Sequence, residues 1–215
     1  GTYYPLTFSK FFSATLLTLD IFSGKLELEG NFEVSEAISE FGQIIRYNLR
    51  GRNIYANISD EIQYALSYYK LQKLRYGDRL NMNIEVSPEI EKLPIIKLIL
   101  QPLIENSIIH GLKHPDGTIN INVRFYMDSS NRLIIQVEDD GLGIPKSCLS
   151  EISNGLKISS ISGNRSSSSS SSIGLANLNE RLRLYYGNDS KLEIDSIENE
   201  YTRVTISIPL TGKEE

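Results

Sequence analysis

The segment that decides the fold is Gln101-Pro-Leu-Ile-Glu-Asn-Ser-Ile-Ile-His-Gly111, taken together with Val137-Glu-Asp-Asp-Gly-Leu-Gly-Ile-Pro145. In the first segment, Asn106 and His110 are four residues apart in an apolar helical run, so both side chains project from one face of a helix. In the second, an acidic residue ends a hydrophobic strand and leads into Gly-x-Gly, whose glycines let the backbone approach a ligand closely. The two segments predict a nucleotide pocket.

A third segment, Ile173-Gly-Leu-Ala-Asn-Leu-Asn-Glu-Arg-Leu182, predicts a helix that begins at Gly174. The free amides and positive dipole of a helix N-terminus commonly bind phosphate. Residues 159–172 include seven consecutive serines from Ser166, and we expect a flexible loop there. Ser172 is a suitable N-cap residue for the predicted helix.

The composition excludes several classes of protein. The chain has 215 residues with a net charge of −5, which argues against a general nucleic-acid surface, because that would need a basic stripe. The single Cys148 excludes an internal disulfide and fits a reducing compartment, and we expect it to be buried. No apolar run approaches the about 18 residues of a membrane span. The start without Met indicates a piece of a longer protein.

The N-terminal part predicts helices. Residues 6–22 and 33–49 have apolar side chains at helical spacing and are joined by a polar turn that contains glycine, which predicts a helical hairpin for dimerisation or docking. A further helix is expected from Ser59, as its capping residue, to about Leu74. We therefore expect a hairpin over 1–57, a linker helix over 58–78 and a second domain over 79–215.

The second domain is expected to be an α/β sandwich of helices against a mixed sheet, so the fold class is α+β. Pro94 is expected to open the helix that carries Asn106 and His110. The further expected elements are a strand over 81–86, paired strands over 119–126 and 133–138, a helix over 173–186 and a closing hairpin of 191–196 and 202–208.

Asp139, Gly141 and Gly143 carry the strongest chemical signal. Asp-Asp-Gly is common turn chemistry after a strand, which is the alternative interpretation. However, Asp139 follows an apolar strand, and a buried unpaired carboxylate there is costly. An adenine amino group would be a natural partner for it, whereas Asp140 could face solvent.

On the predicted helix, Asn106 is either a capping or surface residue or a neutral oxygen ligand of the kind that suits Mg²⁺. His110, four residues later, lies at the same pocket wall. Glu105 points about 100° away from Asn106 and either polarises a nucleophile or lies on a solvated face. His114 is in a turn, and we assign it no role.

These segments resemble a known family. Leu100-Gln-Pro-Leu-Ile-Glu-Asn106 with His110-Gly111 resembles the N box of sensor histidine kinases of the LytS/YesM type, in the GHKL ATPase superfamily. Asp139-Asp-Gly-Leu-Gly143 resembles their G1 box, and Ile173-Gly-Leu-Ala-Asn177 resembles their G2 box. The resemblance implies a Bergerat-type ATP-binding domain over 79–215.

The resemblance also implies roles. Asn106 would ligate Mg²⁺, Asp139 would recognise the adenine amino group, and residues 159–172 would form the ATP lid. The reaction implied is transfer of the γ-phosphoryl group of ATP to a histidine and then to an aspartate of a response regulator. A homodimer is implied, as the cytoplasmic portion of a bacterial membrane receptor whose membrane region is missing here. The nucleotide-binding residues implied are Asn106, His110, Asp139, Gly141, Gly143, Gly174 and Leu175.

One departure from the family supports an alternative. The family carries its acceptor in Pro-His-Phe-x-x-Asn-Thr-Leu, and here Ser9-Lys-Phe-Phe-Ser-Ala-Thr-Leu16 puts Lys10 at the acceptor position. The alternative is a degenerate, non-phosphorylating module that binds ATP or only dimerises. Two other classes are disfavoured. ATPases of the gyrase, MutL and heat-shock type have a hydrolytic Glu where Pro102 stands, and anti-sigma serine kinases lack the long hairpin.

Overall fold

The structure is a computed structural model of the chain, and it describes residues 4–49, 53–112, 117–150, 152 and 170–210. The chain forms two compact units, one of residues 1–54 and 63–75 and the other of residues 55–62 and 76–215.

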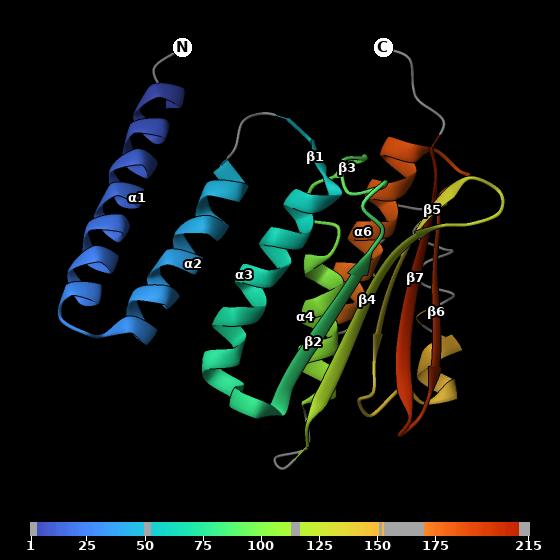
Figure 1. Cartoon of the computed structure of the whole chain (residues 1–215). Coiled ribbons are helices and arrows are strands. Elements are labelled where there is room, and N and C mark those ends of the chain that lie inside the picture. Colours follow the sequence, from blue (N-terminus) through green and yellow to red (C-terminus); the bar gives the residue numbers. More distant parts are fainter. Residues whose placement is uncertain (1–3, 50–52, 113–116, 151, 153–169, 211–215) are drawn as a thin grey trace. The chain divides into compact units, whose positions relative to one another are not determined.

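The first unit is built on a helical hairpin, as predicted. Helices α1 (Tyr4–Leu28) and α2 (Phe32–Leu49) pack side by side (Figure 1). Gly30 makes the turn with a φ of +81°, a conformation that glycine adopts without steric cost. α1 continues six residues beyond the predicted end at residue 22.

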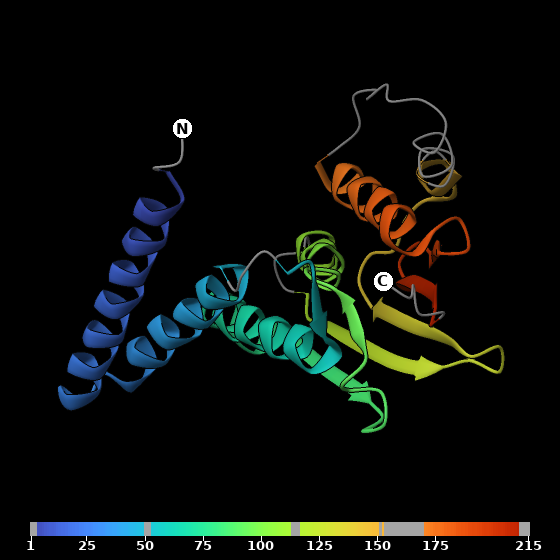
Figure 2. The same ribbon diagram turned by 90° about the horizontal axis from the view of Figure 1, so that it is seen from above.

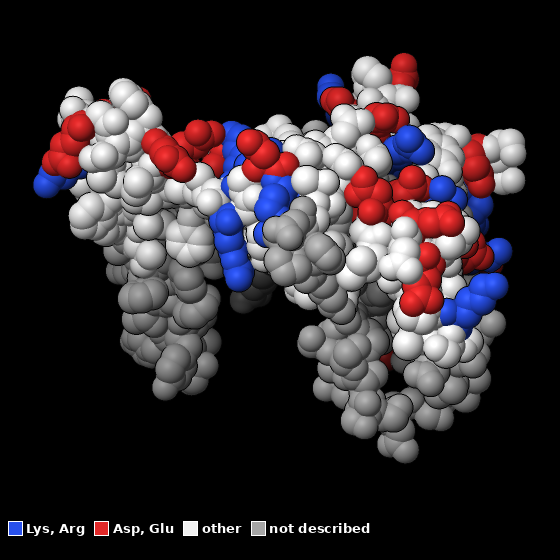
Figure 3. Space-filling model, turned by 90° about the horizontal axis from the view of Figure 1, so that it is seen from below, with Lys and Arg blue, Asp and Glu red and all other residues white. Residues whose placement is uncertain are grey.

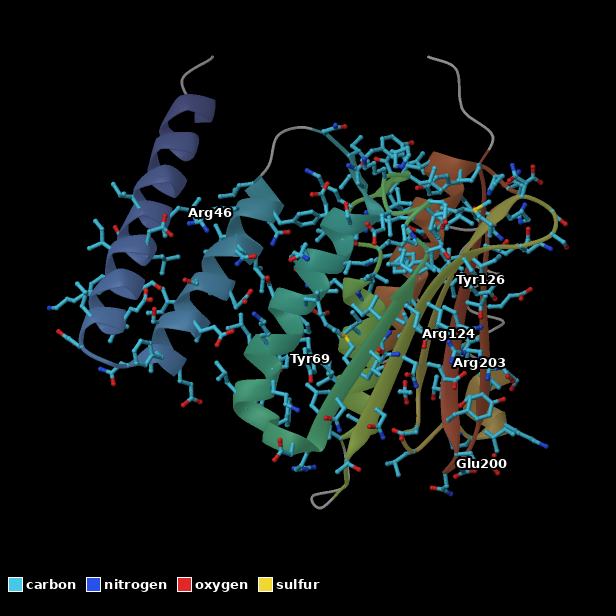
Figure 4. The ribbon with its side chains drawn as sticks, in the orientation of Figure 1. Arg46, Tyr69, Arg124, Tyr126, Glu200 and Arg203 are labelled. Atoms are coloured by element: carbon cyan, nitrogen blue, oxygen red, sulfur yellow. The ribbon has the colours of Figure 1, made fainter. Side chains whose placement is uncertain are left out.

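Small polar side chains form part of the contact between α1 and α2. The Ser23 and Ser35 hydroxyls lie 2.9 Å apart, and each also donates to the other residue's backbone carbonyl at 2.9 Å. Further along, Arg46 of α2 forms an ion pair with Asp20 of α1 (Figure 4). Because both serines are buried and satisfied, the hairpin has a polar seam in addition to its apolar contacts.

Helix α3 (Ile58–Tyr76) contributes residues to both units. In the first unit, the Tyr64 ring packs on Tyr47 with ring centroids 4.9 Å apart. Lys70 bridges two carboxylates of α2, at 3.1 Å from Glu36 and 2.6 Å from Glu40. These carboxylates raise the pKa of Lys70, so the bridge keeps its charge.

The second unit contains a five-stranded mixed sheet in the order β2-β4-β5-β7-β6, in which β2 and β4 are parallel and the other pairs antiparallel. A separate two-stranded sheet pairs β1 with β3. The predicted α+β class is therefore confirmed. The elements are β1 (Tyr55–Asn57), α3, the 3-10 turn η1 (Gly77–Arg79), β2 (Leu80–Val86), β3 (Pro94–Ile96), α4 (Gln101–Gly111), β4 (Ile119–Met127), β5 (Arg132–Asp139), α6 (Ser170–Tyr186), β6 (Lys191–Ile197) and β7 (Tyr201–Pro209).

Helices α4 and α6 cover one face of the five-stranded sheet (Figures 1 and 2). The covered face is apolar because alternate residues of each strand point toward the helices. On β5 this inward row runs through Leu133, Ile135 and Val137 and ends at Asp139, all of them buried. The strand register therefore places one carboxylate at the end of an otherwise apolar row.

The opposite face of the sheet carries charged and aromatic side chains, among them Arg124 and Tyr126 of β4 (Figure 4). Arg124 pairs with Glu85 at 3.3 Å, and Arg203 of β7 pairs with Glu138 at 2.5 Å. In the view of Figure 3, Lys and Arg side chains are interspersed with Asp and Glu.

Two predicted helix starts are wrong. Pro94 does not open a helix; it begins β3, which pairs with β1, and α4 starts at Gln101. Proline is acceptable as the first residue of a strand, and Leu98, with a φ of 57°, interrupts any helix before Gln101. α3 begins at Ile58 rather than Ser59, and the Asn57 amide donates to the Asp60 carboxylate at 3.3 Å, so Asp60 supplies the capping interaction.

The third helix start is also earlier than predicted. α6 begins at Ser170, so Ser172 lies inside its first turn and is not the N-cap, and Gly174 is its fifth residue. Serine costs little in a first turn, where backbone amides still lack helical partners. Cys148 is exposed, contrary to prediction, because it lies outside the strands that form the core. Within the described ranges, no helix is both long and apolar enough to cross a membrane.

Candidate nucleotide site

The Asp139 carboxyl group is the centre of the site. It is 6% exposed, and it lies where β5 meets α4. The Ser107 hydroxyl of α4 donates to Asp139 Oδ2 at 2.7 Å, and the Gly141 amide donates to Asp139 Oδ1 at 3.2 Å. The carboxylate is thus fixed by one donor from the helix and one from the loop after the strand.

The environment of Asp139 raises its pKa to about 6. Burial is the largest cause, because it disfavours the charged form. The hydrogen bonds from Ser107 and Gly141 oppose the shift, whereas the charges of Asp140 and Glu138 add to it. Asp139 is therefore mostly ionised at neutral pH, but its pKa lies close to neutral pH. Such a raised pKa is common for carboxyl groups in functional sites.

Helix α4 positions the other predicted residues. Its buried face, which includes Ser107 and Gly111, packs on the sheet, and Asn106 lies beside that face, half-buried. The Asn106 Nδ2 atom is buried and has no hydrogen-bond partner among the described residues. His110 is also half-buried, one turn further along the helix. The structure therefore brings Asn106, Ser107 and Asp139 into one region.

Three glycines allow the chain to pass closely around Asp139. A Cβ atom on Gly141 would lie 2.7 Å from the Gly111 Cα atom, so the loop after β5 touches the end of α4. Gly143 has a φ of +62°, and a Cβ there would lie 2.0 Å from the Ile197 carbonyl oxygen. The Ile144 amide donates to Ser196 Oγ at 2.8 Å, which ties this loop to the β6–β7 hairpin. Gly141 and Gly143 are thus required by geometry as well as by motif.

Gly174 and Leu175 lie in α6, whose first turns face the start of α4. A Cβ on Gly174 would lie 3.9 Å from the Pro102 Cβ atom, an ordinary contact, so the fold itself does not require glycine there. The Leu175 side chain is buried with 7% exposure. The Leu175 side chain is therefore part of the hydrophobic core.

The remaining candidates have other surroundings. Glu105 is half-buried, and its carboxylate accepts a hydrogen bond from Gln101 Nε2 at 2.7 Å. Asp140 is exposed, as predicted, and its carboxylate accepts a hydrogen bond from the Asn120 backbone amide at 2.7 Å. Lys10 is in α1, but its side chain lies outside the described residues, as do His114 and residues 153–169.

Sequence reasoning missed Ser107. A signal was present, since Ser107 is four residues before Gly111 and four after Leu103, on the buried face of the helix. A buried hydroxyl group needs a hydrogen-bond acceptor, and the sequence already predicts a buried carboxylate at Asp139. The interaction was missed because the sequence does not show which strand end lies beneath the helix.

The donor set limits the kind of metal that the site could bind. The described residues contain no group of three or more His, Cys, Asp or Glu side chains that could hold a metal ion. Asn106 offers one neutral amide oxygen, and its amide nitrogen lacks a partner within the described part of the chain. Such a set fits Mg²⁺ that arrives with phosphate oxygens and keeps its waters, not a metal that the protein holds alone.

Comparison with known proteins shows the family of the chain. Residues 92–212 match the family of histidine kinase-, DNA gyrase B- and HSP90-like ATPases, and residues 10–80 match the histidine kinase family. The sensor protein kinase HptS of Staphylococcus aureus (strain USA300) is 30% identical over 174 residues, which are 81% of this chain and 32% of HptS. The chain thus spans about a third of the length of the curated relatives it matches.

Solved structures share the fold. The histidine kinase domain of the blue-light activated histidine kinase EL346 from Erythrobacter litoralis superposes with a TM-score of 0.52 and 14% identity, covering 86% of this chain and 83% of that domain. The catalytic domain of the histidine kinase ThkA gives a TM-score of 0.51 with 17% identity, covering 72% of this chain and 94% of that domain.

The chain belongs to the histidine kinase-, DNA gyrase B- and HSP90-like ATPases, because that family matches more than half of it. Within this superfamily it is a sensor histidine kinase region, and its second unit contains the ATP-binding domain. The predicted family is confirmed, and the kinase interpretation is favoured over the degenerate module.

Proposed function

We propose that this chain is the kinase region of a two-component sensor histidine kinase and binds Mg-ATP between α4 and the loop that follows β5. The observation that carries the proposal is the buried Asp139 carboxylate, held by Ser107 and Gly141 at the end of an apolar strand row. A buried carboxylate with a raised pKa is costly to keep, and such groups cluster at functional sites. Membership of the ATPase family supports the same assignment.

Asp139 would select the base. Its carboxylate accepts hydrogen bonds, and the adenine 6-amino group donates them, whereas guanine presents an acceptor oxygen at that position. Ser107 and Gly141 hold the carboxylate in place before the nucleotide arrives. Gly141 and Gly143 would let the adenine ring lie against the backbone. His110 would form part of the pocket wall.

Asn106 would hold Mg²⁺ together with the phosphates of ATP. When bound, the metal ion neutralises charge on the phosphates during transfer. The first turns of α6, with Gly174 and the Leu175 backbone, would present amides toward the phosphates. For Glu105 we propose a role in polarising the attacking nucleophile, with Gln101 holding its carboxylate.

The proposed reaction passes the γ-phosphoryl group to an imidazole nitrogen of a histidine, with release of ADP, and then to an aspartate of a response regulator. Lys10 occupies the acceptor position of this chain, and at neutral pH a lysine ammonium is a poor nucleophile. The hairpin is proposed to form a homodimer. We further propose that the chain is the cytoplasmic portion of a bacterial membrane receptor, because the matched residues make up only 32% of the sensor kinase HptS.

The experiment incubates the chain and its Lys10→His variant with γ-labelled ATP and Mg²⁺, and then treats the labelled protein with acid and with alkali. Asp139→Asn is the matched control, since it removes the charge that we assign to adenine recognition. We expect an acid-labile, alkali-stable label on the Lys10→His variant and none on the same variant that also carries Asp139→Asn.

The result on the unaltered chain decides how the acceptor is supplied. Label on His110 or His114 would mean that the chain has its own acceptor. Label only on the Lys10→His variant would mean that catalysis is intact and the acceptor comes from another chain. No label on either form, with no transfer to a regulator, would contradict the kinase assignment.

A further inference from the structure

A second buried carboxylate lies outside the nucleotide site, at the beginning of α3. Glu61 is 0% exposed, and its carboxylate accepts three backbone amides: Leu98 at 2.6 Å, Ile99 at 2.9 Å and Leu100 at 3.3 Å. Leu98 has a φ of 57°, which is unusual for a side chain of its size. The strained loop at residues 97–100 is thus held from α3 by a charged group.

The same loop is held from α6 by a group of opposite charge. Arg181 donates through one guanidinium nitrogen to the Leu98 carbonyl at 3.3 Å and through the other to the Lys97 carbonyl. Just before the loop, the Ile96 amide donates to the Tyr186 hydroxyl at 2.8 Å. Burial raises the pKa of Tyr186 to about 12, so this hydroxyl keeps its proton. Glu61 therefore binds amides and Arg181 binds carbonyls of one short loop.

This loop leads directly into the helix of the nucleotide site. Leu100 is the N-cap residue of α4, and it has no polar side chain with which to cap the helix. The Glu61 carboxylate supplies negative charge at this positive helix end instead. α4 then carries Asn106 and Ser107, so the position of its first turn affects both the proposed metal ligand and the donor that holds Asp139.

The backbone strengthens the link between α3 and this loop. β1, immediately before α3, pairs with β3, immediately before the loop. In addition, the Ile58 amide donates to the Leu93 carbonyl at 3.1 Å, and the Ser59 amide donates to the Glu91 carbonyl at 2.9 Å. Within the second unit, these hydrogen bonds connect the start of α3 to the start of α4. α3 itself continues into the first unit.

We propose that Glu61 and Arg181 are positioning residues of the kinase reaction, which clamp residues 97–100 from two sides and couple the start of α3 to the nucleotide-binding helix α4. The proposal rests on the proposed function, because it requires that α4 binds Mg-ATP. It predicts that nucleotide binding protects the amides of Leu98, Ile99 and Leu100 and that this protection depends on Glu61. By linkage, a change at the start of α3 then alters nucleotide affinity.

The test is amide hydrogen exchange on the whole chain, with and without Mg-ATP, combined with calorimetric titration of ATP in Mg²⁺ and in EDTA. In Glu61→Gln we expect exchange at Leu98–Leu100 to be about tenfold faster, since charge-assisted hydrogen bonds are replaced by weaker ones. We also expect loss of the Mg-ATP-dependent protection, and about a tenfold smaller gain in ATP affinity from Mg²⁺. Glu193→Gln, an exposed glutamate on β6, is the matched control and should behave like the unaltered chain.

Arg181→Lys tests the other side of the clamp and keeps the proposal falsifiable if Glu61→Gln does not fold. Lysine keeps the charge but not the forked geometry, so we expect the same changes at a smaller size. Unchanged exchange and unchanged Mg²⁺ dependence in a folded Glu61→Gln or Arg181→Lys variant would overturn the proposal. If the unaltered chain binds no ATP, the proposed function fails and the positioning role fails with it. Faster exchange at Leu98 in the variants would then show only a structural clamp.

Discussion

At the scale of residues, Asp139 shows a conflict between stability and the proposed function. A carboxyl group whose pKa is raised from about 4 in the unfolded chain favours folding at low pH, and this contribution is lost as the pH rises through the folded-state pKa. For Asp139 that value is about 6, so at neutral pH the ionised group lowers the stability of the fold. We interpret this cost as the consequence of keeping, in an apolar row, a carboxylate that we propose to bind adenine.

The first prediction follows from this conflict. Asp139→Asn should raise the free energy of unfolding at pH 7 by on the order of 2 kcal/mol, because it removes a buried charge while the Ser107 hydroxyl can rotate to remain bonded. The gain should shrink between pH 6 and pH 4, where Asp139 itself becomes protonated. Urea denaturation at several pH values measures it. An equal or lower stability of the variant at pH 7 would contradict the assigned pKa shift.

The second prediction concerns Ser107, whose hydroxyl stabilises the ionised form of Asp139. Ser107→Ala should raise the pKa of Asp139 further, so the pH below which ATP affinity falls should rise by about one unit. Titrations of ATP from pH 5 to pH 8 measure this shift. Ser190→Ala is the control, since Ser190 is also buried and donates to the Gly187 carbonyl at 2.7 Å. ATP's own ionisation affects all variants equally, so identical profiles for the two variants would refute the role of Ser107.

At the scale of elements, much of the sheet was predictable, whereas the helix starts were not. The strands β4 and β5 and the closing hairpin were predicted, and the structure confirms them. β4 alternates buried residues with more exposed ones, whereas β5 is a more continuous apolar run. The start of α4 was misplaced because Pro94 serves equally well as a first helical or first strand residue, and only pairing with β1 decides between them. Such pairing depends on residues about 40 positions away, which no local pattern reports.

The third prediction compares two glycines from different elements. Gly143→Ala should lower the free energy of unfolding by at least about 2 kcal/mol, because it combines a positive φ with a clash against the Ile197 carbonyl. Gly174→Ala should leave stability unchanged or raise it by up to about 1 kcal/mol, since alanine favours a helix interior. Thermal and urea unfolding measure both. A Gly174→Ala variant that is stable but binds ATP more weakly would support backbone contact with the phosphates, and a strongly destabilised one would contradict the placement of Gly174 within α6.

At the scale of the whole molecule, the ATP-binding unit includes residues that precede the predicted domain boundary. Residues 55–62 belong to it, since β1 pairs with β3 and Glu61 binds the loop before α4. The boundaries at 57/58 and 78/79 remain predictions. The motifs indicated α4 and the end of β5 as the candidate site, because their chemistry is local, and the roles of these residues remain predictions. Ser107 and Glu61 were not predicted, because each acts on a residue more than 30 positions away.

The fourth prediction tests this boundary with two fragments. A fragment of residues 55–215 should unfold in one cooperative transition. A fragment of residues 79–215 should be less stable by about 3 kcal/mol or more, because β3 loses its partner strand and three amides lose the Glu61 carboxylate. Urea denaturation of both measures the difference. Equal stability of the two fragments would show that the domain begins at residue 79.

The central claim, that α4 and Asp139 form an ATP site, is tested most directly by calorimetric titration of the chain with ATP and with GTP in Mg²⁺, beside Asp139→Asn. We predict that ATP binds with one site per chain, that GTP binds at least about 100-fold more weakly, and that the folded Asp139→Asn variant loses ATP binding by a similar factor. Equal binding of ATP and GTP, or unchanged ATP binding by Asp139→Asn, would contradict the account.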